Sequence, residues 1–147
     1  MVKRIERIWA MPNKRTFTIK PIKELIDEEI GDEYLDPFPF EYKEDATDYL
    51  QRVYPFDYGV FDPPYSPRQL KECYKGLGEY DTKASTWSNW KDLMAEKVLN
   101  KCISFGWNTT GLGKNRGFEI SRILIVCHGG MHNDTICTVE RRVQERL

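Results

Sequence analysis

Four consecutive residues, Asp62-Pro63-Pro64-Tyr65, have types and an order suited to holding a base that carries an exocyclic amine. Such an amine is a poor nucleophile, and it needs acceptors that hold its hydrogens while the nitrogen lone pair turns toward an electrophile. The Asp62 carboxylate and the Pro63 carbonyl offer two acceptors on a backbone that prolines restrict, and the Tyr65 ring offers a stacking face for an extruded base. These residues predict a base-modifying site. A structural loop in which Asp62 caps a helix beginning near Pro67 is the alternative.

The residues before this motif predict the strand that positions it. Phe56–Phe61 is an apolar, aromatic-rich run that stops where three prolines fall between positions 63 and 67. A buried strand would therefore deliver Asp62 to its carboxyl end. Further upstream, Pro21–Ile30 places apolar residues at helical spacing between an N-terminal proline and Gly31, which predicts an amphipathic helix.

The other segments alternate between strand-like and helix-like patterns. Strands are expected at 33–36, 101–106, 122–127 and 134–139, and helices at 45–52, 69–74 and 90–99, with a polar, irregular stretch at 80–90 and a glycine-rich loop at 107–117. Long connections predict parallel pairing, and the short last connection predicts an antiparallel hairpin. The expected fold is α/β, with a mostly parallel sheet whose one reversed strand lies at an edge.

Open α/β sheets bind ligands beyond the carboxyl ends of their strands. Asp36, Asp62 and Trp107 each follow an expected strand. We therefore expect these three residues to share one rim of the sheet.

Composition indicates one soluble domain spanning residues 1–147. The chain is 40% hydrophobic and 31% charged, and it holds no apolar run of the length that a membrane helix needs. The start, Met1–Glu6, lacks the apolar core of a secretory signal, so we expect a cytoplasmic protein without membrane contact. Cysteines at least ten positions apart and only two histidines, His128 and His132, favour the absence of a metal site.

The near-neutral net charge of -1 conceals a strong asymmetry along the chain. Residues 1–23 carry seven basic and one acidic side chains, residues 24–62 carry two basic and thirteen acidic, and residues 63–147 carry thirteen basic and nine acidic. A phosphate backbone is attracted by local positive potential, so a nucleic-acid surface is expected from the outer two segments.

Three segments resemble the S-adenosylmethionine-dependent N6-adenine DNA methyltransferases, especially the small versions encoded by phages and prophages. They are Thr16–Ile26, which looks like a cofactor motif leading a helix, Asp36-Pro37-Phe38, which looks like the first-strand cofactor motif, and the more specific DPPY motif at 62–65. Residues 103–108 and 123–142 are similar to the closing half of the small phage enzymes. The resemblance implies a three-layer Rossmann-like methyltransferase fold that methylates the N6 amine of a flipped-out adenine in DNA, in the host cytoplasm if a phage encodes the protein.

By this resemblance, Asp62 and Pro63 would hold the target amine, with Pro64 beside them, and Tyr65 would stack on the base. The residues that would bind the S-adenosylmethionine cofactor are Thr18, Lys20, Pro21, Asp36, Pro37, Phe38, Asp45 and Ala46. From their own chemistry, polar and aromatic side chains around the glycine-rich loop are the expected DNA contacts, namely Trp107, Asn108, Lys114, Asn115 and Arg116.

The sequence departs from the family after its first cofactor motif. Pro39-Phe40-Glu41 stands where family members carry small, glycine-bearing residues, and only eight residues separate Asp36 from Asp45. That is too few for a helix and a parallel return strand, so the cofactor half of the sheet is expected to be shortened. Three alternatives stay open: a catalytically degenerate nucleic-acid-binding module, methylation of another exocyclic amine in cytosine, RNA or glutamine, and an inhibitor that binds a host protein. A homo-oligomer that completes the pocket is a further possibility.

Overall fold

The computed structural model describes residues 4–13, 15–38, 45–63, 84–130 and 132–143. Along the chain these residues form β1 (Arg4–Trp9), the 3-10 helix η1 (Thr16–Thr18), α1 (Lys20–Glu29), α2 (Ala46–Arg52), β2 (Phe56–Phe61), α4 (Ala84–Lys97), β3 (Val98–Gly106), the 3-10 helix η2 (Lys114–Arg116), β4 (Phe118–Cys127) and β5 (Thr135–Arg142). The helix expected at 69–74 lies outside the described residues. No helix in the described part of the chain has the length and apolarity needed to cross a membrane.

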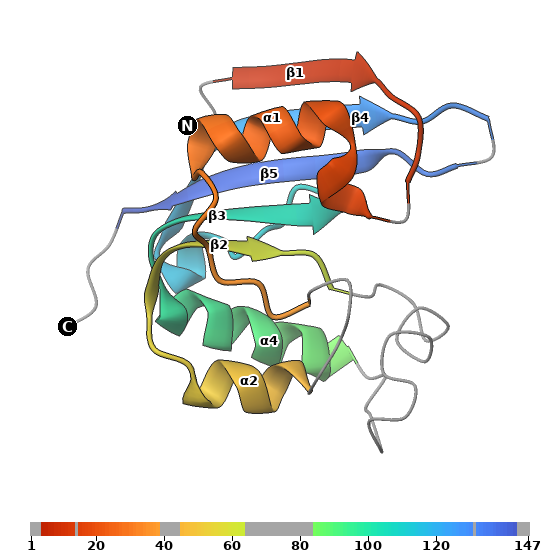
Figure 1. Ribbon diagram of the computed structural model, residues 1–147. Coiled ribbons are helices and arrows are strands. Elements are labelled where there is room, and N and C mark those ends of the chain that lie inside the picture. The colour runs from red at the N-terminus through yellow and green to blue at the C-terminus, as the bar shows by residue number, and fades with distance from the viewer. Residues whose placement is uncertain (1–3, 14, 39–44, 64–83, 131, 144–147) are drawn as a thin grey trace.

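Five strands form one sheet in the order β1-β4-β5-β3-β2 (Figure 1). β1 pairs parallel with β4 and β2 pairs parallel with β3, whereas β5 is antiparallel to both of its neighbours. The expected α/β class is therefore confirmed, with a mostly parallel Rossmann-like sheet and an antiparallel C-terminal hairpin.

The reversed strand lies inside the sheet, so its expected position at an edge is wrong. β5 returns from β4 through a short connection and fills the space between β4 and β3, where it pairs on both sides. The edge beyond β4 is taken by β1, which the sequence patterns did not predict. β1 has one paired side, and its side chains are mostly exposed, so it lacks the apolar run by which buried strands are recognised.

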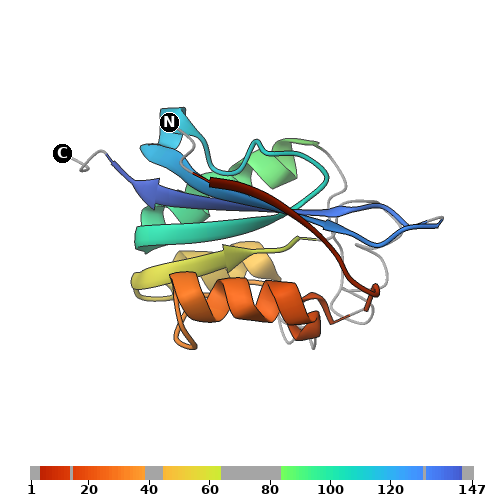
Figure 2. The ribbon, with the colours of Figure 1, turned by 90° about the horizontal axis from the view of Figure 1, so that it is seen from above.

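Helices cover both faces of the sheet and make three layers (Figure 2). On one face α1 packs Ile22, Leu25 and Ile26 against strand residues such as Val60 and Ile103. On the other face α2 and α4 join a second apolar cluster that contains Leu50, Trp90, Met94, Phe61 and Cys102. The alternation of Val60 and Phe61 between the two clusters follows from the period of two along a strand.

The segment expected as a strand at 33–36 is reduced to one parallel bridge between Leu35 and Gly59. Leu35 N–H donates to the carbonyl of Tyr58 and its own carbonyl accepts from Val60 N–H, both at 2.9 Å. Pro37 has no N–H with which to continue the ladder. On the side of β2 that faces away from β3, the described residues therefore add only this single bridge to the sheet. This agrees with the expected shortening of the cofactor half.

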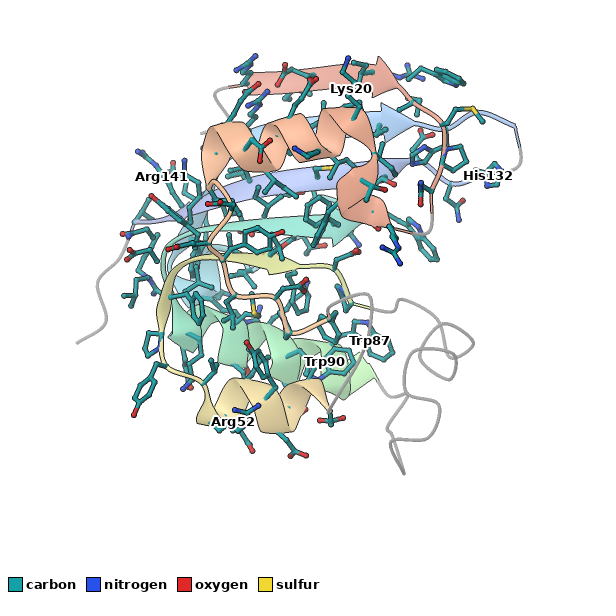
Figure 3. The ribbon with its side chains drawn as sticks, viewed as in Figure 1. Lys20, Arg52, Trp87, Trp90, His132 and Arg141 are labelled. Carbon is teal, nitrogen blue, oxygen red and sulfur yellow. The ribbon has the colours of Figure 1, made fainter. Side chains whose placement is uncertain are left out.

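Helix α4 begins at Ala84, so the expectation of an irregular stretch up to Trp90 is wrong for its last part. Trp87 and Trp90 lie three positions apart on one side of the helix, with ring centroids 5.4 Å apart (Figure 3). Both indoles pack in the apolar cluster between α2 and the sheet, and Trp90 Nε1 donates to Thr47 Oγ1 of α2 at 3.0 Å. Helix α4 thus begins earlier in the chain than the polar composition of residues 80–90 indicated.

A nearly buried guanidinium joins the outer strands to α1. Arg122 on β4 donates from Nε to Glu6 of β1 at 2.6 Å, and from one terminal nitrogen to Glu28 and Glu29 of α1 at 2.8 and 3.1 Å. The Arg122 side chain is only 8% exposed, and its three carboxylate partners compensate its lost hydration.

Replacing Arg122 with Ala should lower the free energy of unfolding by about 2 to 3 kcal/mol, because three neighbouring carboxylates would lose the cation between them. Urea unfolding at neutral pH measures this change. Arg141→Ala is the matched control, since Arg141 is half exposed and pairs with Glu119 at 3.5 Å. That control should change stability by less than about 0.5 kcal/mol. Similar losses in the two variants would contradict the assigned role of Arg122.

Candidate functional site

Asp36 and Asp62 lie together at the carboxyl-end rim of the sheet. Asp62 directly follows β2, and Asp36 directly follows the Leu35 bridge on the adjacent side. The negative charge of Asp36 acts on Asp62, and the Thr16 side chain hydrogen-bonds to Asp62. The expectation that these two acids share one rim is therefore confirmed, and residues from three separate segments converge there.

Burial changes the acidity of both carboxyl groups. It raises the pKa of Asp62 to about 7, an effect that the Thr16 hydrogen bond opposes and the charge of Asp36 reinforces. Burial also raises the pKa of Asp36 to about 6, although the Phe38 N–H, which donates to Asp36 Oδ1 at 3.0 Å, acts in the opposite direction. Asp62 is therefore close to half ionised near neutral pH, whereas Asp36 is mostly ionised there. Raised pKa values of this kind cluster at functional sites.

Aromatic rings close the α1 side of this acidic pair. Phe17 in η1 packs on Phe105 of β3 with ring centroids 5.1 Å apart and on Tyr34 at 6.2 Å. The charge of Asp62 contributes to raising the pKa of the Cys137 thiol on β5. Cys137 belongs to the apolar cluster on the α1 side of the sheet. Thr16, in the same 3-10 helix as Phe17, bonds to Asp62, so the chain leading into α1 approaches the acid pair, whose two residues are half-buried.

The residues predicted to bind a cofactor from the helix-leading motif lie along this entrance to α1. Lys20 and Pro21 form its first turn, with Lys20 exposed. The Thr18 hydroxyl donates to the carbonyl of Arg15 at 2.7 Å, and it is Thr16 that bonds to the acid pair. The segment Thr16–Ile26, which resembles a cofactor motif, includes both hydroxyls. The sequence pattern alone does not tell whether the Thr16 or the Thr18 hydroxyl faces the end of β2.

The first-strand motif divides between the site and the core. Asp36 belongs to the acid pair. The Phe38 ring is instead 5% exposed and packs on Trp90 and Phe61, with ring centroids 4.8 and 5.7 Å away. Pro37 is buried as well. The Phe38 ring is thus enclosed by the α2 and α4 cluster, and its predicted role in lining a cofactor pocket stays a prediction.

Asp45 and Ala46 begin α2 at the same end of the sheet (Figure 1). Asp45 Oδ1 accepts from Thr47 N–H at 2.8 Å and from Asp48 N–H at 3.4 Å, so this carboxylate caps the helix. Ala46 is fully buried. These observations explain both residues structurally, and their predicted contact with a cofactor stays a prediction.

Of the DPPY motif, the structure describes Asp62 and Pro63. Pro63 is buried directly after the strand, so the position of its carbonyl follows that of β2. Pro64 and Tyr65 lie outside the described residues, as does the helix start near Pro67 that would make Asp62 a cap. The stacking role of Tyr65 and the capping alternative both stay predictions.

The predicted DNA-contact residues separate into two groups. Trp107 and Asn108 follow β3 at the carboxyl-end rim, and both are exposed. The 3-10 helix η2 consists of Lys114, Asn115 and Arg116. It lies just before the start of β4 and therefore at the amino ends of the parallel strands, opposite the carboxyl-end rim. β3 and β4 run in the same direction, so their connection must return along the whole sheet. The two groups therefore lie at opposite ends of the strands, and the contact of Trp107 and Asn108 with DNA stays a prediction.

Arg116 is also engaged within the fold. Its Nε donates to Asp92 at 2.7 Å, and its other nitrogens donate to the Leu112 carbonyl at 3.0 Å and to Ser88 on α4. These bonds tie η2 to α4 and account for the side chain. Lys114 and Asn115 are exposed beside it, and their contact with DNA stays a prediction.

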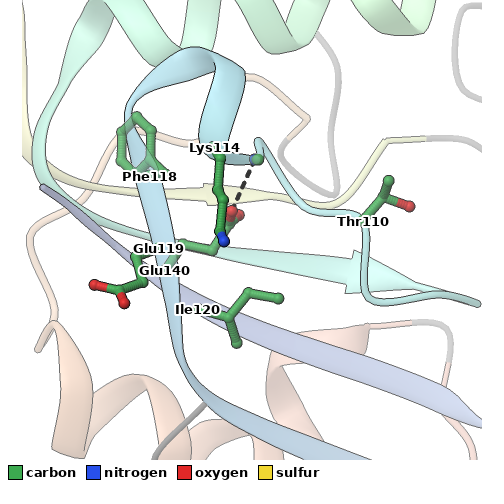
Figure 4. A pocket seen from close by; sticks show the side chains of 7 residues that line it. Thr110, Lys114, Phe118, Glu119, Ile120 and Glu140 are labelled. Carbon is green, nitrogen blue, oxygen red and sulfur yellow. Dashed lines mark hydrogen bonds between the residues drawn. The ribbon is translucent and has the colours of Figure 1, made fainter. Parts of the chain in front are cut away.

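A buried carboxylate that the sequence reasoning missed holds the β3–β4 connection. Glu140 of β5 accepts Leu112 N–H at 2.7 Å. It also accepts Gly113 N–H at 2.8 Å (Figure 4). Burial raises the pKa of Glu140, and the two backbone N–H groups oppose that shift. A cavity of about 260 Å³ lies next to this contact, lined by Thr110, Gly113, Lys114, Phe118, Glu119, Ile120 and Glu140. Glu140 is the single acidic residue of β5, and its place directly after the run Ile136–Val139 was the available signal.

The two histidines lie near the connection between β4 and β5. His128 is bonded through its two ring nitrogens to the Ala10 carbonyl and the Thr135 hydroxyl, at 2.9 and 2.8 Å. His132 is exposed on the connection (Figure 3). Within the described ranges, no three potential metal ligands gather into one group.

Asp62→Asn should change how stability depends on pH. The folded-state pKa of Asp62, about 7, exceeds its ordinary value of 3.8, so ionisation disfavours the folded state. The stability of the wild type relative to the Asn variant should therefore fall as pH rises from about 4 to about 7. We expect a relative loss of about 1 to 3 kcal/mol over this range in urea unfolding.

Asp57→Asn is the control for this measurement, because Asp57 lies on the same strand with an exposed side chain. Its stability difference from the wild type should stay nearly constant with pH. Parallel stability curves for the wild type and Asp62→Asn would show that the Asp62 carboxyl is not held in a destabilising environment.

Comparisons with known proteins give structural likeness without sequence likeness. No protein-family model matches this sequence, and no curated protein matches it. Three solved methyltransferase structures are similar to it. Magnesium protoporphyrin IX methyltransferase from Synechocystis PCC 6803, crystallised with bound SAM, has 9% identity and a TM-score of 0.44, with 96% of this chain and 70% of that chain covered.

Two further methyltransferase structures are similar to this chain. TrmN from Thermus thermophilus has 11% identity and a TM-score of 0.46, covering 96% of this chain and 44% of that one. The N-methyltransferase NodS from Bradyrhizobium japonicum WM9 has 12% identity and a TM-score of 0.43, covering 97% and 87%.

Proposed function

We propose that this protein transfers a methyl group from S-adenosylmethionine to an exocyclic amine of a nucleic-acid base, specifically the N6 amine of adenine in DNA. The observation that carries the proposal is the convergence of Asp62, Asp36 and Thr16 at the carboxyl end of a buried parallel strand. Ligands of open α/β sheets bind at this end of the strands. The DPPY motif begins at the same point.

Asp62 and Pro63 act on the substrate amine in this proposal. The ionised Asp62 carboxylate and the Pro63 carbonyl would accept the two amine hydrogens, which directs the nitrogen lone pair away from the ring. Thr16 is a positioning residue, because its hydrogen bond orients the Asp62 carboxyl. No residue of the chain needs to form a covalent intermediate. A base reaches such a site only after extrusion from a duplex, and Tyr65 would supply its stacking face.

The acid pair fits a positively charged ligand. Within the described part of the chain, neither Asp36 nor Asp62 is hydrogen-bonded or ion-paired to a basic side chain, and burial raises the pKa of both. A cation placed between them would stabilise their ionised forms. S-adenosylmethionine carries a sulfonium and an ammonium group, and when bound it supplies an electrophilic methyl group. Asp36, with Lys20 and Pro21 at the start of α1, would hold it.

A second candidate is a nucleic-acid-binding module that has lost cofactor binding. The reduction of the first strand to the Leu35 bridge favours it, because a single bridge leaves little sheet from which to build a cofactor pocket. This candidate predicts salt-sensitive DNA binding without methyl transfer. The two candidates differ first in whether S-adenosylmethionine binds.

Isothermal titration with S-adenosylmethionine tests the cofactor site directly. The wild type should bind, and Asp36→Asn should weaken binding by about tenfold or more because it removes one carboxylate from the cation site. Affinity in the wild type should rise with pH through the range of about 6 to 7, as both acids ionise. Asp27→Asn, at an exposed acid on α1, makes the same change of charge and should bind normally.

Lack of binding by the wild type, with and without DNA, would reject the enzyme and favour the binding module. Equal affinity in Asp36→Asn and Asp27→Asn would remove Asp36 from the site. A pH-independent affinity would contradict the role of the acid pair.

Mass spectrometry of DNA from expressing cells tests the reaction and its substrate. N6-methyladenine should appear with the wild type and with Asp57→Ala, and should fall to background with Asp62→Ala, because a methyl side chain offers no acceptor for the amine hydrogens. The Asp57 control lies on the same strand with an exposed side chain. N4-methylcytosine in place of N6-methyladenine would keep methyl transfer and correct the substrate. Background levels in all three, despite cofactor binding, would reject DNA as the substrate.

A further inference from the structure

The strand at one edge of the sheet has an unpaired side. β1 hydrogen-bonds to β4 along one side, and no other described strand pairs with it (Figure 1). Ala10 N–H donates to the Cys127 carbonyl at 3.0 Å, so the N–H groups at even positions point toward β4. Because these directions alternate along a strand, the N–H and carbonyl groups of Ile5, Arg7 and Trp9 point outward. An open edge of this kind is a template for another strand.

Large apolar side chains are exposed along the same strand. Ile5 and Trp9 share one face and are 66% and 62% exposed, and Ile8 on the other face is 45% exposed. Met11, just beyond the strand, is 69% exposed. The strand contains no proline and no bulge, two devices that commonly protect an open edge. Exposed apolar groups beside free backbone donors and acceptors indicate that a partner covers this edge.

The sequence of β1 disfavours some antiparallel registers with a second copy and favours others. A two-fold axis perpendicular to the sheet would lie between the two β1 strands. The residue beside the axis would then face its own copy in the partner subunit. An axis at Glu6 or at Arg7 would place like charges directly opposite each other, which is unfavourable.

An axis at Ile8 avoids all of these conflicts. It pairs Ile8 with Ile8 of the partner subunit. It also places Arg7, whose Nε donates to Cys127 Sγ at 3.0 Å, opposite Trp9 of the partner subunit, where the guanidinium can lie against an indole. It also brings Ile5 opposite Met11 of the partner subunit. Every exposed apolar side chain of the edge thereby gains a favourable neighbour, and the outward backbone groups of Arg7 and Trp9 bond to each other's copies.

We propose that this protein forms a symmetric dimer in which β1 pairs antiparallel with β1 of a second copy about an axis at Ile8. The two five-stranded sheets then form one continuous sheet. The antiparallel arrangement points the two carboxyl-end rims in opposite directions, so each acid pair stays accessible. The dimer goes beyond the proposed methyl transfer and does not depend on it.

Cysteine cross-linking tests the register. Even positions form the pairs without hydrogen bonds at this edge, and facing side chains in such pairs have Cβ atoms about 4.5 to 5.5 Å apart, close to what a disulfide needs. Ile8→Cys should form a covalent dimer under mild oxidation. Ile5→Cys, which is more exposed, should not, because six positions separate it from its own copy, or about 20 Å. Cross-linking of Ile5→Cys alone, or equal cross-linking of both, would overturn the register.

Sedimentation velocity tests the dimer itself. The wild type should sediment as twice its chain mass of 17.4 kDa. Ile8→Lys, which puts two ammonium groups at the axis, and Arg7→Pro, which removes an outward N–H, should both sediment as monomers with an unchanged circular dichroism spectrum. Leu99→Lys is the control, since Leu99 is 48% exposed on β3 and should leave the dimer intact. A monomeric wild type at every concentration, or dimers in both β1 variants, would overturn the proposal.

Discussion

Close packing at Gly59 sets the position of β2 and, through it, of Asp62. A Cβ atom at this residue would lie 2.5 Å from Cγ2 of Val98 and 3.1 Å from Cε of Met94, both of which belong to the α4 side of the sheet. Only glycine lets the strand lie this close to the β3 start and to α4 while its other edge bonds Leu35. The carboxyl end of β2, the adjacent Asp36 and the approach of Thr16 all depend on this placement.

Local patterns predicted the elements that depend on local interactions. β2 has the bounds expected from its apolar run, α1 starts one residue before the expected proline, and α2 begins after Asp45, whose carboxylate caps it. Pairing between distant segments was predicted less well. The insertion of β5 between β4 and β3 and the addition of β1 at the far edge depend on partners more than 100 residues away or on crossovers whose course no local pattern specifies.

The candidate site was predictable in its acids and less so in their neighbours. Asp36 and Asp62 follow from the rule that ligand sites lie beyond parallel strand ends, together with the DPPY motif. Thr16, Phe17 and Glu140 act through the directions of their side chains, which depend on packing across the sheet. The predicted DNA-contact residues of the β3–β4 connection lie within ten positions of one another in the sequence. The parallel direction of the two strands nevertheless places Trp107 and Lys114 at opposite ends of the strands.

The acidic pair is the feature of the fold that most needs a functional explanation. Two carboxyl groups held together in a poorly hydrated position lower the stability of the unliganded protein at neutral pH, as their raised pKa values require. An amide or a hydroxyl at either position would keep the hydrogen bonds to Phe38 or Thr16 without this penalty. A ligand that carries positive charge removes the penalty when it binds, because it stabilises both ionised acids. Destabilising groups retained at the ligand end of a sheet are therefore better explained by binding than by folding.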